Sequence, residues 1–339
     1  MPVPRVDLSS VGSSVDPRLD RRERRIWEIV STSPLNSLWN LQGVPAKVVA
    51  TRTWKSVVED RIFGHAAELG FYFLFALFPT LFSASSILGL AARSASQIYV
   101  KLLDYLALVI PTAALGTVLD TFNETTAAST SGKLTFGLIA AIWSASVGIS
   151  ALQDTLNVVY KIEDSRSFIR ARISAIGLTI LLTAIVSLGL ACMLGGDFMA
   201  ALSRHWIHDD FICALATVAA RLVGWVLATL FLALAFAVIY YWAPDVKVRC
   251  WRWLTPGGAM GILGWLVASL GLRVYLHFFN NYSVTYGSLG AVIILLTWFY
   301  LTGLMLLVGA EINSEIEAAA AEMRVANASP PLPPLQAIG

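Results

Sequence analysis

Charge is scarce in this chain. Only 14% of its 339 residues are Asp, Glu, Lys or Arg, whereas 57% are hydrophobic and the mean hydropathy is +0.69. Soluble domains carry roughly a quarter charged residues, so the composition excludes an ordinary soluble protein. It predicts a polytopic membrane protein of the all-α class.

Cysteine and histidine are equally rare, with three Cys and four His. The cysteines lack the spacing of a disulfide framework or a zinc site. The segment "HWIHDD" (205–210) could offer His205, His208 and Asp209 to a metal, but we favour a solvated loop because a metal site needs a complete ligand set. P-loop, Rossmann and GxSxG patterns are also lacking. We therefore expect no metal, no cofactor and no enzymatic activity.

Basic residues are too few and too clustered for nucleic-acid binding. The formal net charge is only +2, and the arginines gather near the N-terminus instead of forming a long stripe. The expected partners are membrane lipids, with other envelope proteins as further candidates.

Long apolar runs are what the sequence does have. A helix needs about 20 mostly apolar residues to cross the hydrocarbon core. Segments of that kind predict a bundle of six transmembrane helices at approximately 68–92, 134–156, 173–196, 222–242, 255–277 and 288–311.

A further apolar stretch, "YLALVIPTAALGTVL" (105–119), is short and interrupted by Pro111. Just upstream, Gln97, Lys101 and Asp104 form one polar stripe on an otherwise apolar segment, a pattern typical of a helix on a membrane surface. We predict amphipathic outer-face helices between spans 1 and 2. A plain solvated loop is the alternative.

Lys and Arg residues set the predicted orientation, because positive charge is enriched in cytoplasmic loops. The loop between spans 5 and 6 carries no charge, whereas the opposite face carries Lys161, Arg166, Arg170, Arg172, Lys247, Arg249 and Arg252 in its short loops. Both termini are therefore predicted to be cytoplasmic. The chain divides into a basic N-terminal arm (1–60), a six-span membrane domain (61–315) and a Pro-rich tail (316–339).

Span 5 has a well-specified start. Thr255 stands at a predicted N-cap and Pro256 at the first helical position. Gly257 and Gly261 follow at a spacing that allows two helices to approach closely.

Five segments resemble the YihY/BrkB family of bacterial inner-membrane proteins: "AAELGFYFLFALFP" (66–79), "WSASVGISALQDTLNVVY" (143–160), "RSFIRAR" (166–172), "WRWLTPG" (251–257) and "YGSLGAVIILLTWFYLTGLMLLVGAEIN" (286–313). The resemblance covers about residues 55–315. It implies a six-helix inner-membrane protein with both ends inside, and it implies no settled activity. An older family label, ribonuclease BN, is disfavoured because His205, His208 and His277 fall on the predicted outer face, away from cytoplasmic RNA.

Polar residues at the helix ends are the candidate site. A cytoplasmic cluster is predicted from Glu68, Asp154, Asn157, Tyr160, Arg170, Arg172 and Glu311. A lone carboxylate at the bilayer centre is costly, so we expect Glu68 to pair with Arg170 or Arg172. The alternative is an acid at a helix start that contacts headgroup water.

An outer vestibule is predicted from Arg273, Asn280, Asn281, Tyr286, Gly287 and Ser288. Its backbone N–H groups and Arg273 could contact a translocated anionic group such as a lipid headgroup. A capped tight hairpin without a ligand is an equal alternative.

Two classes of function fit these features. The first is a transport-like role, the translocation of a lipid or a small anionic solute. The second is a non-conducting envelope scaffold that partners another membrane complex. A central cavity would separate them, and the sequence alone does not show one.

Overall fold

The computed structural model describes residues 15–16, 19–35, 37–39, 44–91, 131–206, 209–278 and 288–328. All the regular secondary-structure elements within these residues are helices, apart from an isolated β-bridge between Val15 and Ile162. The all-α prediction is confirmed for this part of the chain. The helices are α1 (Arg21–Thr32), α2 (Ala46–Glu59), α3 (Ile62–Ala91), α6 (Ser131–Val159), α7 (Phe168–Trp206), α8 (Asp210–Trp242), α9 (Pro256–Phe278) and α11 (Ser288–Ala328).

Four helices are long and apolar enough to cross a membrane. They are α7, α8, α9 and α11, and α3 adds the shorter apolar stretch Ile62–Leu77. The helix α6 covers the predicted second span, 134–156. The membrane-spanning character is thus supported, whereas the count of six spans stays a prediction. The predicted amphipathic helices between spans 1 and 2 lie outside the described residues.

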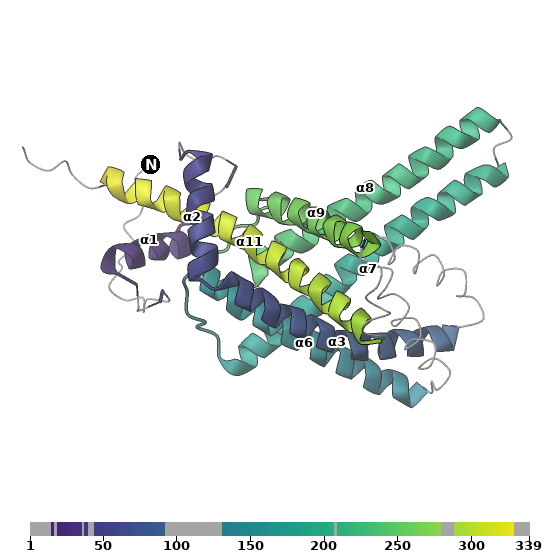
Figure 1. Ribbon diagram of the computed structural model, residues 1–339, viewed down its shortest axis with the longest axis horizontal. Coiled ribbons are helices and arrows are strands. Elements are labelled where there is room, and N and C mark those ends of the chain that lie inside the picture. Colours follow the sequence, from purple (N-terminus) through teal and green to yellow (C-terminus); the bar gives the residue numbers. More distant parts are fainter. Residues whose placement is uncertain are drawn as a thin grey trace, which may run out of the picture.

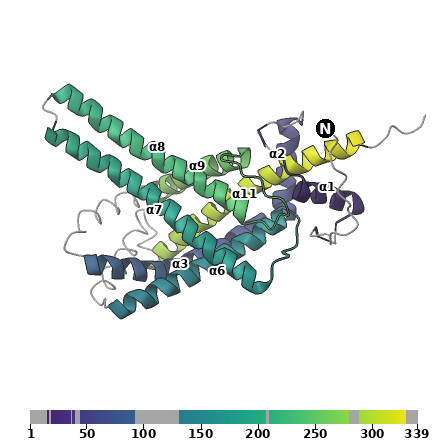
Figure 2. The ribbon, with the colours of Figure 1, turned by 180° about the vertical axis from the view of Figure 1, so that it is seen from behind.

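The helices form one bundle with a projecting arm. Helix α3 packs between α6 and α11, and α9 packs on α11. Helices α7 and α8 pair along their length and extend away from the other helices in both views (Figures 1 and 2). Helices α1 and α2 and the C-terminal part of α11 gather at one end, which we call the terminal end (Figure 1). The first described helix and the end of the last one therefore lie at the same end of the bundle.

Helix α11 is longer than a membrane is thick. Its 41 residues span about 60 Å at 1.5 Å per residue, about twice the hydrocarbon thickness. It continues without a break past residue 311, where the sequence placed the end of span 6. Helices α1 and α2 pack on it, so its C-terminal part forms the core of the terminal end.

The start of α9 locks that helix onto α11. Thr255 Oγ1 accepts the Gly258 N–H at 2.9 Å, which confirms the predicted N-cap. Asn313 of α11 donates to the same oxygen and accepts the Gly257 N–H, both at 2.9 Å. A Cβ on Gly257 would lie 1.9 Å from the Gly309 carbonyl oxygen, so only glycine allows this approach.

Candidate functional site

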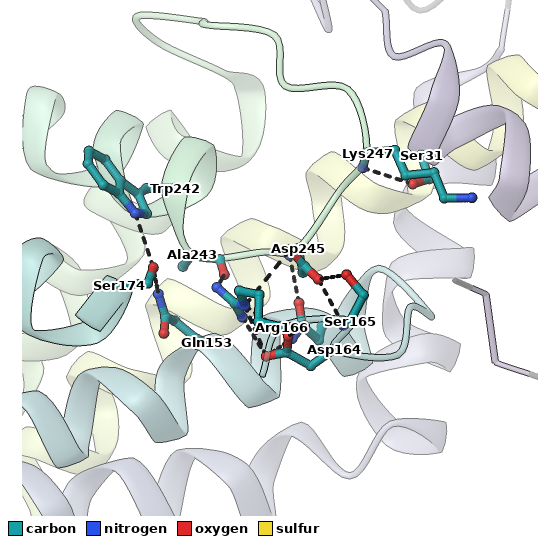
Figure 3. Close-up of polar contacts among 11 residues, drawn as sticks. Ser31, Gln153, Asp164, Ser165, Arg166, Ser174, Trp242, Ala243, Asp245 and Lys247 are labelled. Carbon is teal, nitrogen blue, oxygen red and sulfur yellow. Dashed lines mark hydrogen bonds and ion pairs between the residues drawn. The ribbon is translucent and has the colours of Figure 1, made fainter. Parts of the chain in front are cut away.

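Two loops at the terminal end meet through a polar network that we call the loop network: Asn157, Asp164, Ser165, Arg166 and Asp245. Figure 3 shows its four loop residues, Asp164, Ser165, Arg166 and Asp245. The α6–α7 loop supplies Asp164, Ser165 and Arg166, and the α8–α9 loop supplies Asp245. Arg166 donates from Nε to Asp164 Oδ1 at 2.8 Å and from Nη2 to Asp164 Oδ2 at 2.7 Å. Ser165 donates from its backbone N–H and its hydroxyl to Asp245 Oδ2, at 2.9 and 2.6 Å.

Asn157 connects this network to helix α6. Its Oδ1 accepts the Asp245 N–H at 2.8 Å, and its Nδ2 donates to Asp164 Oδ2 at 3.4 Å. Asn157 is only 4% exposed, and these two hydrogen bonds fix the orientation of its amide. The ends of α6 and α8 are therefore fixed to each other by side-chain hydrogen bonds.

One guanidinium faces two carboxylates in the loop network. The Arg166 side chain is only 6% exposed and lies between the carboxylates of Asp164 and Asp245. Burial would raise the pKa of the Asp164 carboxyl, but the hydrogen bonds and charge of Arg166 outweigh burial and hold that pKa below its ordinary value. Asp164 is therefore ionised at neutral pH and serves as a structural counter-ion.

A second junction lies deeper between α6, α7 and α8. Gln153 Nε2 donates to Ser174 Oγ at 3.1 Å, and Trp242 Nε1 donates to the same hydroxyl at 3.2 Å (Figure 3). One serine of α7 thus ties the helices on both sides of it. Helix α1 joins the same region because Ser31 Oγ accepts the Lys247 N–H at 3.2 Å.

Buried acids line the face of α11 that meets α2 and α6. We call Asp60, Lys161, Glu311 and Glu315 the carboxylate cluster. Lys161 Nζ forms an ion pair with Asp60 Oδ1, and Ser56 Oγ donates to Glu315 Oε1 at 2.6 Å. Glu311 is 1% exposed, and its Oε2 accepts from Ser314 Oγ at 3.3 Å. The side chains bring the α2–α3 turn, the end of α6 and the middle of α11 together.

Ion pairs further along α11 attach the surrounding elements. Arg52 of α2 contacts Glu322 at 2.7 Å. Arg252 of the α8–α9 loop contacts Glu317 at 2.5 Å, with the glutamate side chain 4% exposed. Removal of one partner of a buried ion pair leaves the other charge uncompensated and destabilises the fold. We therefore expect Arg252 to contribute to the free energy of unfolding.

The structure gives Glu68 a charged neighbour other than the predicted Arg170 or Arg172. The Glu68 carboxylate lies 3.5 Å from His65 Nδ1, one turn earlier on α3, and half of its side chain is exposed. The Arg172 guanidinium lies 4.1 Å from the centre of the Trp143 ring and donates to the Trp143 carbonyl at 3.3 Å, whereas Arg170 is exposed. Glu68 lies beyond the first turn of α3, which carries no acid, so the helix-start alternative does not describe it either.

The other predicted residues of the cytoplasmic cluster divide between the two networks. Asn157 belongs to the loop network and Glu311 to the carboxylate cluster. Asp154 is close enough to Asp164, Arg166 and Glu68 for their charges to act on it. Tyr160 is buried near Glu317, Arg252 and Glu311, and burial raises the pKa of its hydroxyl, so it stays neutral.

The predicted outer vestibule is described only at its edges. Arg273 lies in α9, and Ser288 is the first residue of α11. Asn280, Asn281, Tyr286 and Gly287 lie outside the described residues. The vestibule therefore stays a prediction.

Sequence reasoning missed Asp60, Lys161, Glu315 and Glu317. The spacing of Glu311 and Glu315, one helical turn apart after an apolar run, was the available signal. Asp60 and Lys161 carried none, because each lies in a turn after a helix and only the packing of α2 and α6 on α11 brings them together.

An apolar groove lies beside the carboxylate cluster. It has a volume of about 600 Å³ and is lined by Ala46, Val49, Ala50, Thr53, Trp54, Val57, Phe63, Pro256, Met260, Leu304, Met305, Val308, Ile312 and Ile316. Helix α2 forms one wall, and the start of α9 and the middle of α11 form the others. Thr53 is the polar exception, and among the described residues its Oγ1 has no hydrogen-bond partner.

The class of protein follows from the apolar helices of membrane-spanning length, which buried ion pairs join at one end of the bundle. It is an integral membrane protein. The particular family follows from comparison. The family model for "Virulence factor BrkB" matches residues 53–332, so the chain belongs to the BrkB family. The predicted resemblance is confirmed.

Individual relatives agree with this class. YfkH of Bacillus subtilis (strain 168), whose name describes it as ribonuclease-like, is 33% identical over 74% of this chain and 88% of its own length. UPF0761 membrane proteins of Stenotrophomonas maltophilia (strain K279a) and Xanthomonas oryzae pv. oryzae (strain PXO99A) are 27% and 26% identical. Each of these two matches covers 78% of this chain and 60% of the relative. No solved structure matches the chain.

Proposed function

We propose that this protein binds membrane lipid in the groove formed by α2, α9 and α11 and takes part in moving lipid across a bacterial inner membrane, with both termini in the cytoplasm. The observation that carries the proposal is the groove itself. Its volume of about 600 Å³ is within the range of small-molecule sites. Its nearly complete apolar lining suits an acyl chain, and it favours a lipid over a small anionic solute.

The surroundings of the groove fit a lipid with an anionic headgroup. Lys47 lies at the start of α2 and Lys55 on its exposed face, and Trp54 is 66% exposed at the mouth. Basic and aromatic residues of this kind gather at headgroup level. Thr53 adds a hydroxyl inside the groove that could donate to a lipid ester.

Translocation of a fluorescent phospholipid in liposomes tests the proposal. Vesicles that contain the purified protein should expose inner-leaflet lipid to an external quencher faster than empty vesicles. Met260→Trp, which fills the groove, should slow that exchange several-fold. Leu266→Trp is the matched control, because Leu266 lies on the same helix, is 51% exposed and does not line the groove. Exchange no faster than in empty vesicles would refute lipid movement.

One observation supports the scaffold role as a second candidate. The α7–α8 hairpin extends away from the remaining helices (Figures 1 and 2), and it carries exposed apolar side chains such as Phe211, Leu215 and Leu222. An apolar hairpin of this kind could pack against another membrane protein. Disulfide crosslinking from single cysteines at these positions to a defined envelope partner, without any lipid exchange, would favour the scaffold.

A further inference from the structure

We propose that Asp60 and Glu311 form a binding site for a single proton, which the two carboxyl groups share. The site goes beyond the proposed lipid function and does not depend on it. It lies at the terminal end, where the turn after α2 meets α11.

The argument begins with the two carboxyl groups. The Asp60 side chain is 8% exposed and Glu311 is 1% exposed, and the two carboxyls are within hydrogen-bonding reach of each other. One oxygen of each is occupied: Asp60 Oδ1 by Lys161 and Glu311 Oε2 by Ser314. The remaining oxygens, Asp60 Oδ2 and Glu311 Oε1, are buried and find no donor among the described residues.

Two ionised carboxylates have no hydrogen to place between them. A buried acceptor without a donor costs roughly 1–3 kcal/mol, and two like charges in contact add repulsion. One proton on either carboxyl supplies the missing donor and satisfies both orphaned oxygens. It also leaves one negative charge, which the Lys161 ammonium balances.

Charged groups of three elements act on the pair or on its neighbours. The turn after α6 supplies Lys161, α11 supplies Glu315, and α2 supplies Arg52, which acts on Glu315 and Glu322. Tyr160 and the Arg252–Glu317 pair lie beyond them. Lys161 is the cation whose charge acts on Glu311. Its single positive charge balances one of the two carboxylates, and the proton neutralises the other.

Two residues in the turns around the pair have left-handed backbone conformations. Arg61 and Lys161 adopt φ angles of 54° and 53°, the left-handed region, although neither is glycine. Such residues cost roughly 1–2 kcal/mol each. Both lie in the turns that present Asp60 and the Lys161 ammonium to each other, so the geometry of the site is maintained against local preference.

A bound proton would connect pH to the groove. Asp60 directly follows α2, and α2 is one wall of the groove. With the proton bound, the turn after α2 is held on α11. Loss of the proton places two negative charges in contact and favours separation of that turn from α11.

Infrared spectroscopy of the purified protein in detergent tests the site. At neutral pH the wild type should show the carbonyl band of a protonated carboxyl group, and Glu311→Gln should lose it. Glutamine keeps the shape of a protonated glutamate and donates its amide N–H to Asp60, so this variant should fold. Glu59→Gln is the control, because Glu59 is 58% exposed and pairs with Lys55. A band that persists unchanged in Glu311→Gln would overturn the proposal.

The pH dependence of the melting temperature gives a second readout. A proton bound more tightly in the folded state stabilises the fold at low pH, and that stability is lost as pH rises through the folded-state titration. The wild type should therefore lose thermal stability on alkalinisation, and Glu311→Gln should lose this dependence. Stabilisation by Na⁺ at constant pH, equal in both proteins, would assign the effect to a cation elsewhere and contradict the proton site.

Discussion

Gly257→Ala tests the contact between α9 and α11. The added Cβ would lie 1.9 Å from the Gly309 carbonyl oxygen and 2.6 Å from Asn313 Oδ1, where ordinary contact begins near 3.4 Å. The helices would have to separate by about 1.5 Å at this point. The Gly257 N–H to Asn313 Oδ1 hydrogen bond would be strained as well.

Overpacking of a close contact costs about 1–3 kcal/mol, and a buried donor without its acceptor adds to that cost. A loss of about 3 kcal/mol lowers the melting temperature by about 4 °C for a chain of 339 residues, at an unfolding entropy of about 2.1 cal/mol/K per residue. Thermal unfolding in detergent measures the shift. Gly271→Ala is the control in the same helix, since no atom lies within 4 Å of its added Cβ. Equal melting temperatures for the two variants would refute the close approach.

Three further predictions concern the terminal end and the topology. Arg252→Gln leaves the buried Glu317 carboxylate without its ion pair, so we expect a loss of about 3–5 kcal/mol in unfolding measurements; an unchanged melting temperature would contradict the pair. Because Arg166 lowers the folded-state pKa of Asp164, this pair stabilises the fold above the ordinary pKa of about 4, and the stabilisation is lost as pH falls through the lower, folded-state pKa. When the melting temperature is measured against pH, Asp164→Asn should reduce its decrease at acid pH. The same decrease in both proteins would contradict the pair. Reporter fusions should place residues 130 and 206 outside the cytoplasm and residues 165, 248 and 325 inside it, and a cytoplasmic signal at 206 would overturn the orientation.

Local chemistry made part of the fold predictable from sequence. Thr255 and Pro256 carry their own helix-start signal, because an N-cap hydroxyl and a proline act within one turn. Gly257 signalled a close helix contact for the same reason, and the structure identifies α11 as its partner.

Partners from distant parts of the chain were less predictable. The expected pairing of Glu68 with Arg170 or Arg172 rested on a shared side of the membrane, which does not set the rotation of each helix about its axis. His65, one turn away on α3, lies beside Glu68, and the Trp143 ring lies beside Arg172. Asp60 and Lys161 were missed because their proximity depends on how α2, α6 and α11 pack.

Photo-crosslinking with a phospholipid that carries the reactive group on its acyl chain tests the central claim, lipid in the groove, most directly. Peptide mapping should find the label on α2, on the start of α9 and on residues 304–316 of α11, and Met260→Trp should reduce it. Labelling spread evenly over exposed apolar residues of α7 and α8, with none on the groove residues, would contradict the account.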